Sequence, residues 1–424
     1  MTRLLAPLLA VALAAGQPAP DARQRSFDIV WKTIKEHHFD PTFGGVDWDG
    51  VRTRYAPKVA AATTDRQLHQ LLQDMVGELK LSHFGIIAPE SFLEDPGPDP
   101  SLGGAGIEVR SSNGEALITK VEPGSGAAQA GVRAGFILRQ VGATPVSEIL
   151  ARVAKTGRPE IRQRLLATRI LQNTVDGPPG TSVKLIFVDG QGTAREADVK
   201  RSPKKGEMSA RMGNMPPQYT EFESKRLESG VGYVRFSLFV ISLMDRVRQA
   251  IRSMSDAPGI IFDVRGNPGG VVGMTGGIAG LIETRETSLG SMQMRTGHIN
   301  AAVFPQPNPY LGPVVVLVDA ASASSSEIFA AGLQAIGRAT VVGERSQGAA
   351  LPSVLQRLPT GAGFQYAIAD FKAPNNVMIE GQGVIPDIEV KLDRASLLAG
   401  RDAQLDAAVA HIQKAAQKNK EKKP

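Results

Sequence analysis

One segment, VVVLVDAASASSSEIFAAGLQ at residues 314–334, constrains the fold of this chain most strongly. It contains a β-branched apolar run, a serine-rich turn and an amphipathic stretch, which predicts a buried strand that turns directly into a helix. Such a turn exposes a side chain at the sheet edge and points the free N–H groups of the helix toward it. This geometry suits a nucleophile at Ser324. The same letters also fit a helix cap formed by Ser324 and Glu327.

The periodicity of the chain predicts several structural regions. Residues 208–395 alternate strands with helices, which indicates a layered α/β domain. Residues 101–203 read as mainly β, and residues 21–95 as a helical domain that ends in a Ser-His pair. The Pro/Gly-rich stretch EDPGPDP (94–100) marks the boundary between these two. The sequence predicts that residues 396–424 form a helical, basic C-terminal tail.

Residues 1–16 have the pattern of a secretory signal peptide, with Arg3 ahead of an apolar run too short to span a bilayer. We therefore expect an exported protein, periplasmic or secreted, with no integral membrane segment after signal cleavage. The net charge is +6, but aromatic residues make up 5% and none interleave with a basic stripe, which argues against nucleic-acid binding. The absence of cysteine excludes disulfides and thiolate metal sites.

Three other places carry residues with catalytic chemistry, each with a structural alternative. GIIFDVRGNPGGVVG (259–273) predicts a strand and a glycine-rich turn, either an anion-binding turn or an ordinary connection. In the expected short strand LSHFGII, His83 follows Ser82 and is either a general base or a structural histidine. Glu380 either orients a hydroxyl or imidazole or lies on the surface. The other histidines show no metal-ligand spacing, so we expect no metal and no cofactor.

Across about residues 225–390, the DVRGNPGG turn, the Ser324 segment, ATVVGE and GQGVIPDI resemble the C-terminal processing serine peptidases, also called tail-specific proteases. The resemblance implies a ClpP/crotonase-like ββα core, within an α/β fold, and hydrolysis of polypeptides with Ser324 as the nucleophile. Many of these peptidases use a lysine base. The matching position here is Ala349, which cannot accept a proton.

The N-terminal region is similar to the part that precedes the core in the tricorn protease branch of these peptidases. That branch uses a histidine base from an E-L-x-x-S-H motif, a neighbouring serine and a late glutamate, and the chain contains the letters ELKLSH. The site that the resemblance implies consists of the nucleophile Ser324, the base His83, the supporting residues Ser82 and Glu380, and oxyanion-hole N–H groups of Ser325 and of Gly269 or Gly270.

Residues 101–203 resemble a PDZ domain. In such a domain a loop binds the C-terminal carboxylate of a peptide, which adds as a strand to the sheet edge. The resemblance places this loop at Ala105, Gly106 and Ile107. The segment at 150–175 is longer than a minimal PDZ helix region, so we expect a reshaped or partly covered groove. The expected partners are polypeptides recognised by their C-termini, and the sequence leaves the oligomeric state open.

The predicted function is an exported serine endopeptidase or tail-processing protease with His83 as its base. A histidine base predicts loss of activity below about pH 6.5, near the pKa of free imidazole, with a shift set by the environment. One alternative is an inactive peptidase-like adaptor that binds protein C-termini, which Ala349 favours. A second is an esterase on the same core. The joint presence of Ser82, His83, Glu380 and the glycine-rich turn favours the peptidase.

Overall fold

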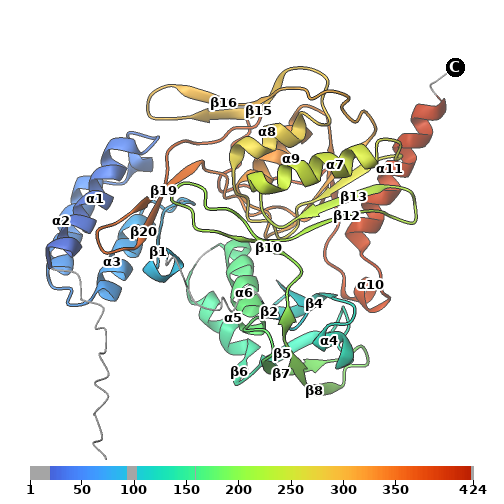
Figure 1. Cartoon of the computed structure of the whole chain (residues 1–424). Coiled ribbons are helices and arrows are strands. Elements are labelled where there is room, and N and C mark those ends of the chain that lie inside the picture. The colour runs from blue at the N-terminus through green and yellow to red at the C-terminus, as the bar shows by residue number, and fades with distance from the viewer. Residues whose placement is uncertain (1–19, 93–102, 158, 422–424) are drawn as a thin grey trace, which may run out of the picture.

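The computed structural model describes residues 20–92, 103–157 and 159–421, so the predicted signal peptide lies outside the described residues. These residues form an α/β core. In the view of Figure 1, a helical unit lies to the left of the core and a β domain lies below the core. None of the helices in these ranges combines the length and the apolar character needed to cross a membrane.

The core is built on a six-stranded sheet in the order β12-β13-β14-β17-β18-β21. Five strands are parallel, and β12 at the edge pairs antiparallel with β13. The two central strands, β14 and β17, are buried along their whole length, which explains their continuous apolar sequences. The strands are β12 (Phe222–Arg226), β13 (Gly232–Phe236), β14 (Ile260–Asp263), β17 (Val314–Val318), β18 (Thr340–Gly343) and β21 (Ile388–Glu389).

Helices cover both faces of this sheet (Figure 1). One face is packed by α7 (Met244–Ser253), α8 (Val272–Ala279) and α9 (Ser325–Ala335). The other face is packed by α11 (Ala403–Glu421), whose Ala408 and Ile412 are fully buried. Helix α11 lies within the predicted tail, and its first half packs against the core. A hairpin and a short helix complete this part: β15 (Thr287–Gln293), β16 (His298–Val303) and α10 (Arg394–Leu398).

The N-terminal helices share a hydrophobic core with a distant part of the chain. This core joins the helices to Leu351, Leu358 and Phe364, which lie near or in a three-stranded sheet of order β1-β20-β19. Ser82 and His83 occupy the turn immediately before β1, which is shorter than the predicted strand. The elements are α1 (Pro20–His37), α2 (Trp48–Ala60), α3 (Asp65–Gly77), β1 (Gly85–Ile87), β19 (Ser353–Arg357) and β20 (Gly363–Ala367).

Residues 103–203, called the inserted domain below, form an antiparallel sheet of order β3-β4-β5-β7-β8 with β6 paired to β5. Helix α6 packs along β3. The main elements are β3 (Ile107–Ser112), β4 (Glu115–Val121), α4 (Gly126–Gln129), β5 (Ile137–Val141), α5 (Val146–Ala154), α6 (Glu160–Val175), β7 (Ser182–Val188) and β8 (Ala194–Lys200). Short strands are β2 (Gly103–Gly104), β6 (Thr144–Pro145), β9 (Ser202–Pro203), β10 (Glu207–Met208) and β11 (Tyr219–Thr220).

Candidate active site

Ser324 lies in a sharp turn between β17 and α9. Its backbone angles are φ 54° and ψ −120°, in a region that residues with a side chain rarely adopt. Ser324 is half-buried, whereas the side chains on either side, Ala323 and Ser325, are buried. It is the N-cap of α9, and Glu327 accepts its N–H at 3.2 Å, as the capping pattern predicts. One residue is therefore both the helix cap and a half-buried serine with a strained backbone.

The carboxylate of Glu327 is completely buried and anchors this turn. One oxygen accepts from Ser346 Oγ at 2.5 Å and from the Gly348 N–H at 2.7 Å. The other accepts from the Ala349 N–H at 2.8 Å and from the Ser324 N–H. Burial raises the pKa of Glu327 to about 7, and these four hydrogen bonds oppose that rise. The carboxylate thus ties the serine turn to the loop at residues 346–349.

Ala349, which occupies the position where the resemblance implies a lysine, takes part in the site through its backbone. Its carbonyl oxygen accepts the Ser324 N–H at 2.8 Å, while its own N–H goes to Glu327. The position is buried, with 4% of Ala349 exposed. It therefore holds the serine turn in place and supplies no base.

The glycine-rich turn packs directly against the serine turn. Gly269 has φ 103° and Gly270 has φ 132°. A Cβ at Gly269 would lie 2.5 Å from Ser324 Cβ and 2.8 Å from Ser325 N, so only glycine permits this approach. The two turns are joined by a hydrogen bond from Ser325 Oγ to the Gly270 carbonyl at 2.9 Å.

Two backbone N–H groups in the serine turn and the glycine-rich turn have no hydrogen-bond acceptor among the described residues. Gly269 N–H donates to Asn267 Oδ1 at 2.9 Å, so it is already occupied. Within the described part of the chain, the N–H groups of Gly270 and Ser325 have no acceptor. Ser325 is also the first residue of α9, where N–H groups have no intrahelical partner. Of the two glycines considered from the sequence, Gly270 has the available donor.

Glu380, Ser82 and His83 form a hydrogen-bonded chain, although Ser82 and Glu380 lie 298 positions apart. Glu380 accepts from the Ser82 N–H and from the Ser82 hydroxyl, both at 2.8 Å. The Ser82 hydroxyl in turn lies 2.7 Å from His83 Nδ1. The Glu380 side chain is 8% exposed, so it is not a surface glutamate. The structure therefore joins Glu380 to the adjacent pair Ser82 and His83, which the resemblance assigned to one site.

The direction of these hydrogen bonds determines the tautomer of His83. Glu380 as a carboxylate can only accept, so the single proton of the Ser82 hydroxyl goes to it. Ser82 Oγ must then accept a proton from His83 Nδ1. This arrangement leaves Nε2 of His83 unprotonated in the neutral ring, which is the form that a general base requires.

The environment of His83 keeps its ring neutral. Burial lowers the pKa of His83 to about 4, and the positive charges of Arg162 and Arg169 add to this effect. The backbone of His83 has φ 58°, a left-handed conformation that is uncommon for residues other than glycine. Strain of this kind concentrates at functional sites.

The serine turn and the Glu380–Ser82–His83 chain meet at adjacent residues. The Ser324 N–H donates to the Ala349 carbonyl at 2.8 Å. The N–H of Ala350, the residue after Ala349, donates to Glu380 at 3.1 Å. Among the described residues, the Ser324 hydroxyl and the His83 imidazole are not hydrogen-bonded to each other. Contacts between catalytic groups often tighten only when substrate binds.

The predicted carboxylate-binding loop lies at the start of β3. Ala105 is completely buried and Ile107 is 5% exposed, while Gly106 is half-buried with φ 80°. Gly106 and Ile107 line a cavity of about 400 Å³ that also reaches Pro268, next to Gly269. The structure thus leaves two of the three predicted residues facing a cavity.

The free edge of β3, where a peptide strand would add, is occupied by α6. Gln172 accepts the Val109 N–H and donates to the Ile107 carbonyl, each at 3.1 Å. Thr168 accepts the Ser111 N–H at 3.0 Å. These side chains replace hydrogen bonds that an added strand would make, so the covered groove expected from the long 150–175 segment has a specific cause.

Sequence reasoning missed one residue of this site and underestimated another. Arg162 on α6 donates to Glu380 at 3.3 Å across 218 positions, and no local motif signals such a contact. Glu327 was expected as a cap, but its bonds to the 346–349 loop depend on the fold. Among the described residues, no group of three or more His, Cys, Asp or Glu side chains could hold a metal ion.

The chain is similar to known peptidases. Residues 230–390 match the peptidase family S41, and residues 19–77 match the tricorn protease C1 domain. A carboxyl-terminal-processing protease of Synechocystis sp. is 25% identical over 89% of this chain and 84% of its own length. A putative tricorn protease homolog of Streptomyces coelicolor is 26% identical over 92% of this chain, which spans 32% of that protein. The solved photosystem II D1 C-terminal processing protease shares the fold, with a TM-score of 0.59, 22% identity and coverage of 92% and 96%.

Proposed function

We propose that this serine peptidase, whose residues 230–390 match peptidase family S41, cleaves polypeptides through an acyl-enzyme on Ser324 with His83 as the general base. One observation carries the proposal: the hydrogen-bonded chain from Glu380 through Ser82 to His83 Nδ1. These hydrogen bonds supply an oriented, neutral imidazole in a protein that has Ala349 at the position of the usual lysine. The base comes from the N-terminal unit and the nucleophile from the core.

The proposed reaction begins when His83 Nε2 accepts the proton of the Ser324 hydroxyl. Ser324 Oγ attacks the scissile carbonyl, and the N–H groups of Ser325 and Gly270 bind the resulting oxyanion, each contributing on the order of 3–4 kcal/mol. The imidazolium then protonates the leaving amine. Water, deprotonated by His83, releases the acyl group and restores the serine.

We further propose that the peptidase recognises substrate C-termini at the cavity that joins Gly106 to Pro268. Lys205 also lines this cavity and supplies positive charge for a carboxylate, whereas the ammonium of Lys204 is paired with Asp176 at 2.6 Å. Since α6 occupies the edge of β3, this recognition uses the loop N–H groups and does not require strand addition along the whole edge. We also propose export, because residues 1–16 have the signal pattern.

Labelling with a fluorophosphonate probe, together with hydrolysis of a fluorogenic peptide, tests the proposed chemistry. We expect wild type to be labelled and active, Ser324→Ala to be unlabelled, and His83→Ala to lose roughly 10²–10⁴-fold in rate. His298→Ala, on an exposed hairpin strand, is the matched control and should resemble wild type. Undiminished activity in His83→Ala would sink the assignment of the base. An unlabelled wild type that still binds C-terminal peptides would instead support the adaptor.

A further inference from the structure

Arg162 connects the inserted domain to the proposed active site. It lies near the start of α6, and its guanidinium donates to Glu380 Oε1 at 3.3 Å and to the Gly348 carbonyl at 3.5 Å. The side chains of Arg162 and Glu380 are 21% and 8% exposed, so water screens this ion pair only weakly. Gly348 belongs to the same loop that Glu327 ties to the serine turn.

The contacts of Glu380 explain what a cation does here. Its Oε1 accepts from the Ser82 N–H and from Arg162. Its Oε2 accepts from the Ser82 hydroxyl and from the Ala350 N–H. A protonated carboxyl would place a donor against one of these donors, so the arrangement requires the ionised form. A buried carboxylate is stable when a charged partner accompanies its hydrogen bonds.

We propose that Arg162 is a positioning residue for the peptidase reaction: it holds Glu380 aligned with Ser82, so that His83 Nδ1–H donates to Ser82 and Nε2 stays free. This inference rests on the proposed function, since it acts through His83. It assigns the inserted domain a direct part in the site. Loss of the arginine leaves Ser324 and the oxyanion N–H groups in place and impairs the base.

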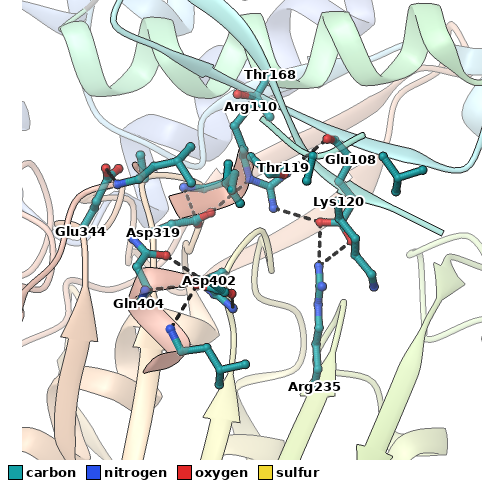
Figure 2. A pocket seen from close by; sticks show the side chains of 18 of the residues that line it. Glu108, Arg110, Thr119, Lys120, Thr168, Arg235, Asp319, Glu344, Asp402 and Gln404 are labelled. Carbon is teal, nitrogen blue, oxygen red and sulfur yellow. Dashed lines mark hydrogen bonds and ion pairs between the residues drawn. The ribbon is translucent and has the colours of Figure 1, made fainter. Parts of the chain in front are cut away.

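A neighbouring arginine separates positioning from simple domain docking. The inserted domain and the core face each other across a cavity of about 370 Å³, shown in Figure 2, that is bridged by ion pairs. Arg235 binds both oxygens of Glu108 at 2.9 Å, and Arg164, on α6 like Arg162, binds Glu344 at 2.8 Å. The Arg164 pair joins the same two parts without contacting Glu380, so it is a matched control.

The charged groups around His83 predict a distinct pH signature. The positive charges of Arg162 and Arg169 on α6 act on the ring, and Glu380 reaches it through Ser82. Removing the Arg162 charge makes protonation of His83 easier, which moves the acid limb of kcat/KM to higher pH. A purely structural loss lowers activity without moving the limb in this direction.

The experiment compares Arg162→Gln, Arg162→Lys and Arg164→Gln in the full chain. We expect Arg162→Gln to lower kcat/KM roughly 10-fold to 100-fold, because the base is misplaced. Its acid limb should rise by about 0.5 pH unit or more. The acid limb of Arg162→Lys should stay at the wild-type pH. Arg164→Gln should keep the wild-type acid limb and a kcat/KM within about 3-fold of wild type.

Two outcomes would overturn the inference. Equal loss of activity in Arg162→Gln and Arg164→Gln, with unmoved acid limbs, would assign Arg162 to domain docking. Wild-type kinetics in Arg162→Gln would deny it any role. Thermal melting of each variant checks that the fold is intact. His83→Ala distinguishes the two proposals. If His83→Ala keeps full activity, the proposed function fails. If His83→Ala is inactive while Arg162→Gln has wild-type kinetics, only the role of Arg162 is overturned.

Discussion

His83 has one ring nitrogen directed to Ser82 and the other left free, and its pKa sets the acidic limit of the proposed reaction. Burial and two arginines lower that pKa to about 4. A depressed pKa keeps the ring neutral as pH falls, until pH reaches the lowered value. The neutral imidazole of His83 therefore predominates above about pH 4, and the protonated form predominates below it.

We expect the acid limb of kcat/KM for the free enzyme near pH 4, well below the value near 6.5 of free imidazole. The sequence-based prediction allowed for a shift set by the environment, and burial gives that shift its direction. A pH profile with a fluorogenic peptide measures the limb, and circular dichroism at each pH excludes acid unfolding as its cause. A limb at about 6.5 would show that water reaches the ring freely.

At the scale of elements, the site depends on two turns that fit only when both have unusual backbone angles. Ser324 has φ 54° and Gly269 has φ 103°. The serine turn is held by hydrogen bonds from Ser325 to Gly270 and from Ser326 to Asn267, both at 2.9 Å. Because these contacts are mutual, a change in the glycine-rich turn moves the nucleophile.

We expect Gly269→Ala to destabilise the protein by about 1–3 kcal/mol, since its Cβ would meet Ser324 Cβ at 2.5 Å in a backbone conformation that disfavours alanine. Activity should fall with it. Gly273→Ala is the control, because no atom lies within 4 Å of its Cβ, and stability should stay within about 1 kcal/mol of wild type. Urea denaturation measures both variants. Equal stabilities would contradict the close approach of the two turns.

At the scale of the whole molecule, the N-terminal unit is completed by residues from the far end of the chain. Its core contains Phe364 and Ala367 of β20, and β20 pairs with β1 directly after His83. The packing of the N-terminal helices therefore depends on the segment that follows Ala349, and so does the position of His83. The domain boundaries expected from composition stay predictions, since this core combines residues from two of the predicted domains.

We expect Phe364→Ala to lower the free energy of unfolding by about 3–5 kcal/mol, because Phe364 is completely buried in the shared core. Activity should also fall, since the pairing of Phe364 with Ile86 supports the strand after His83. Val354→Ala in the adjacent strand is the control. That valine is 38% exposed, so its loss should change stability by less than about 1 kcal/mol. A small effect at Phe364 would mean that the helical unit folds without β20.

Local features of this site were readable from the chain because they depend on neighbouring residues. The strand, serine turn and helix around Ser324 follow from hydrophobic pattern and turn residues, and so does the glycine-rich turn at Gly269. The pair Ser82 and His83 was found through a short motif. The roles of these residues stay predictions until the kinetic tests are made, whereas the similarity to the S41 peptidases and the α/β fold with N-terminal helices are confirmed.

By itself the sequence determined which residues are candidates for catalysis: a serine in a strand-to-helix turn and a histidine without a metal motif. It also showed that the position expected for a lysine base is Ala349. Only the tertiary structure decided how they are connected. It aligned Glu380 with Ser82, placed Arg162 of the inserted domain on that carboxylate, and lowered the pKa of His83. The physical reason is that hydrogen bonds, burial and charge act over a few ångströms in space, between residues that may be hundreds of positions apart in the chain.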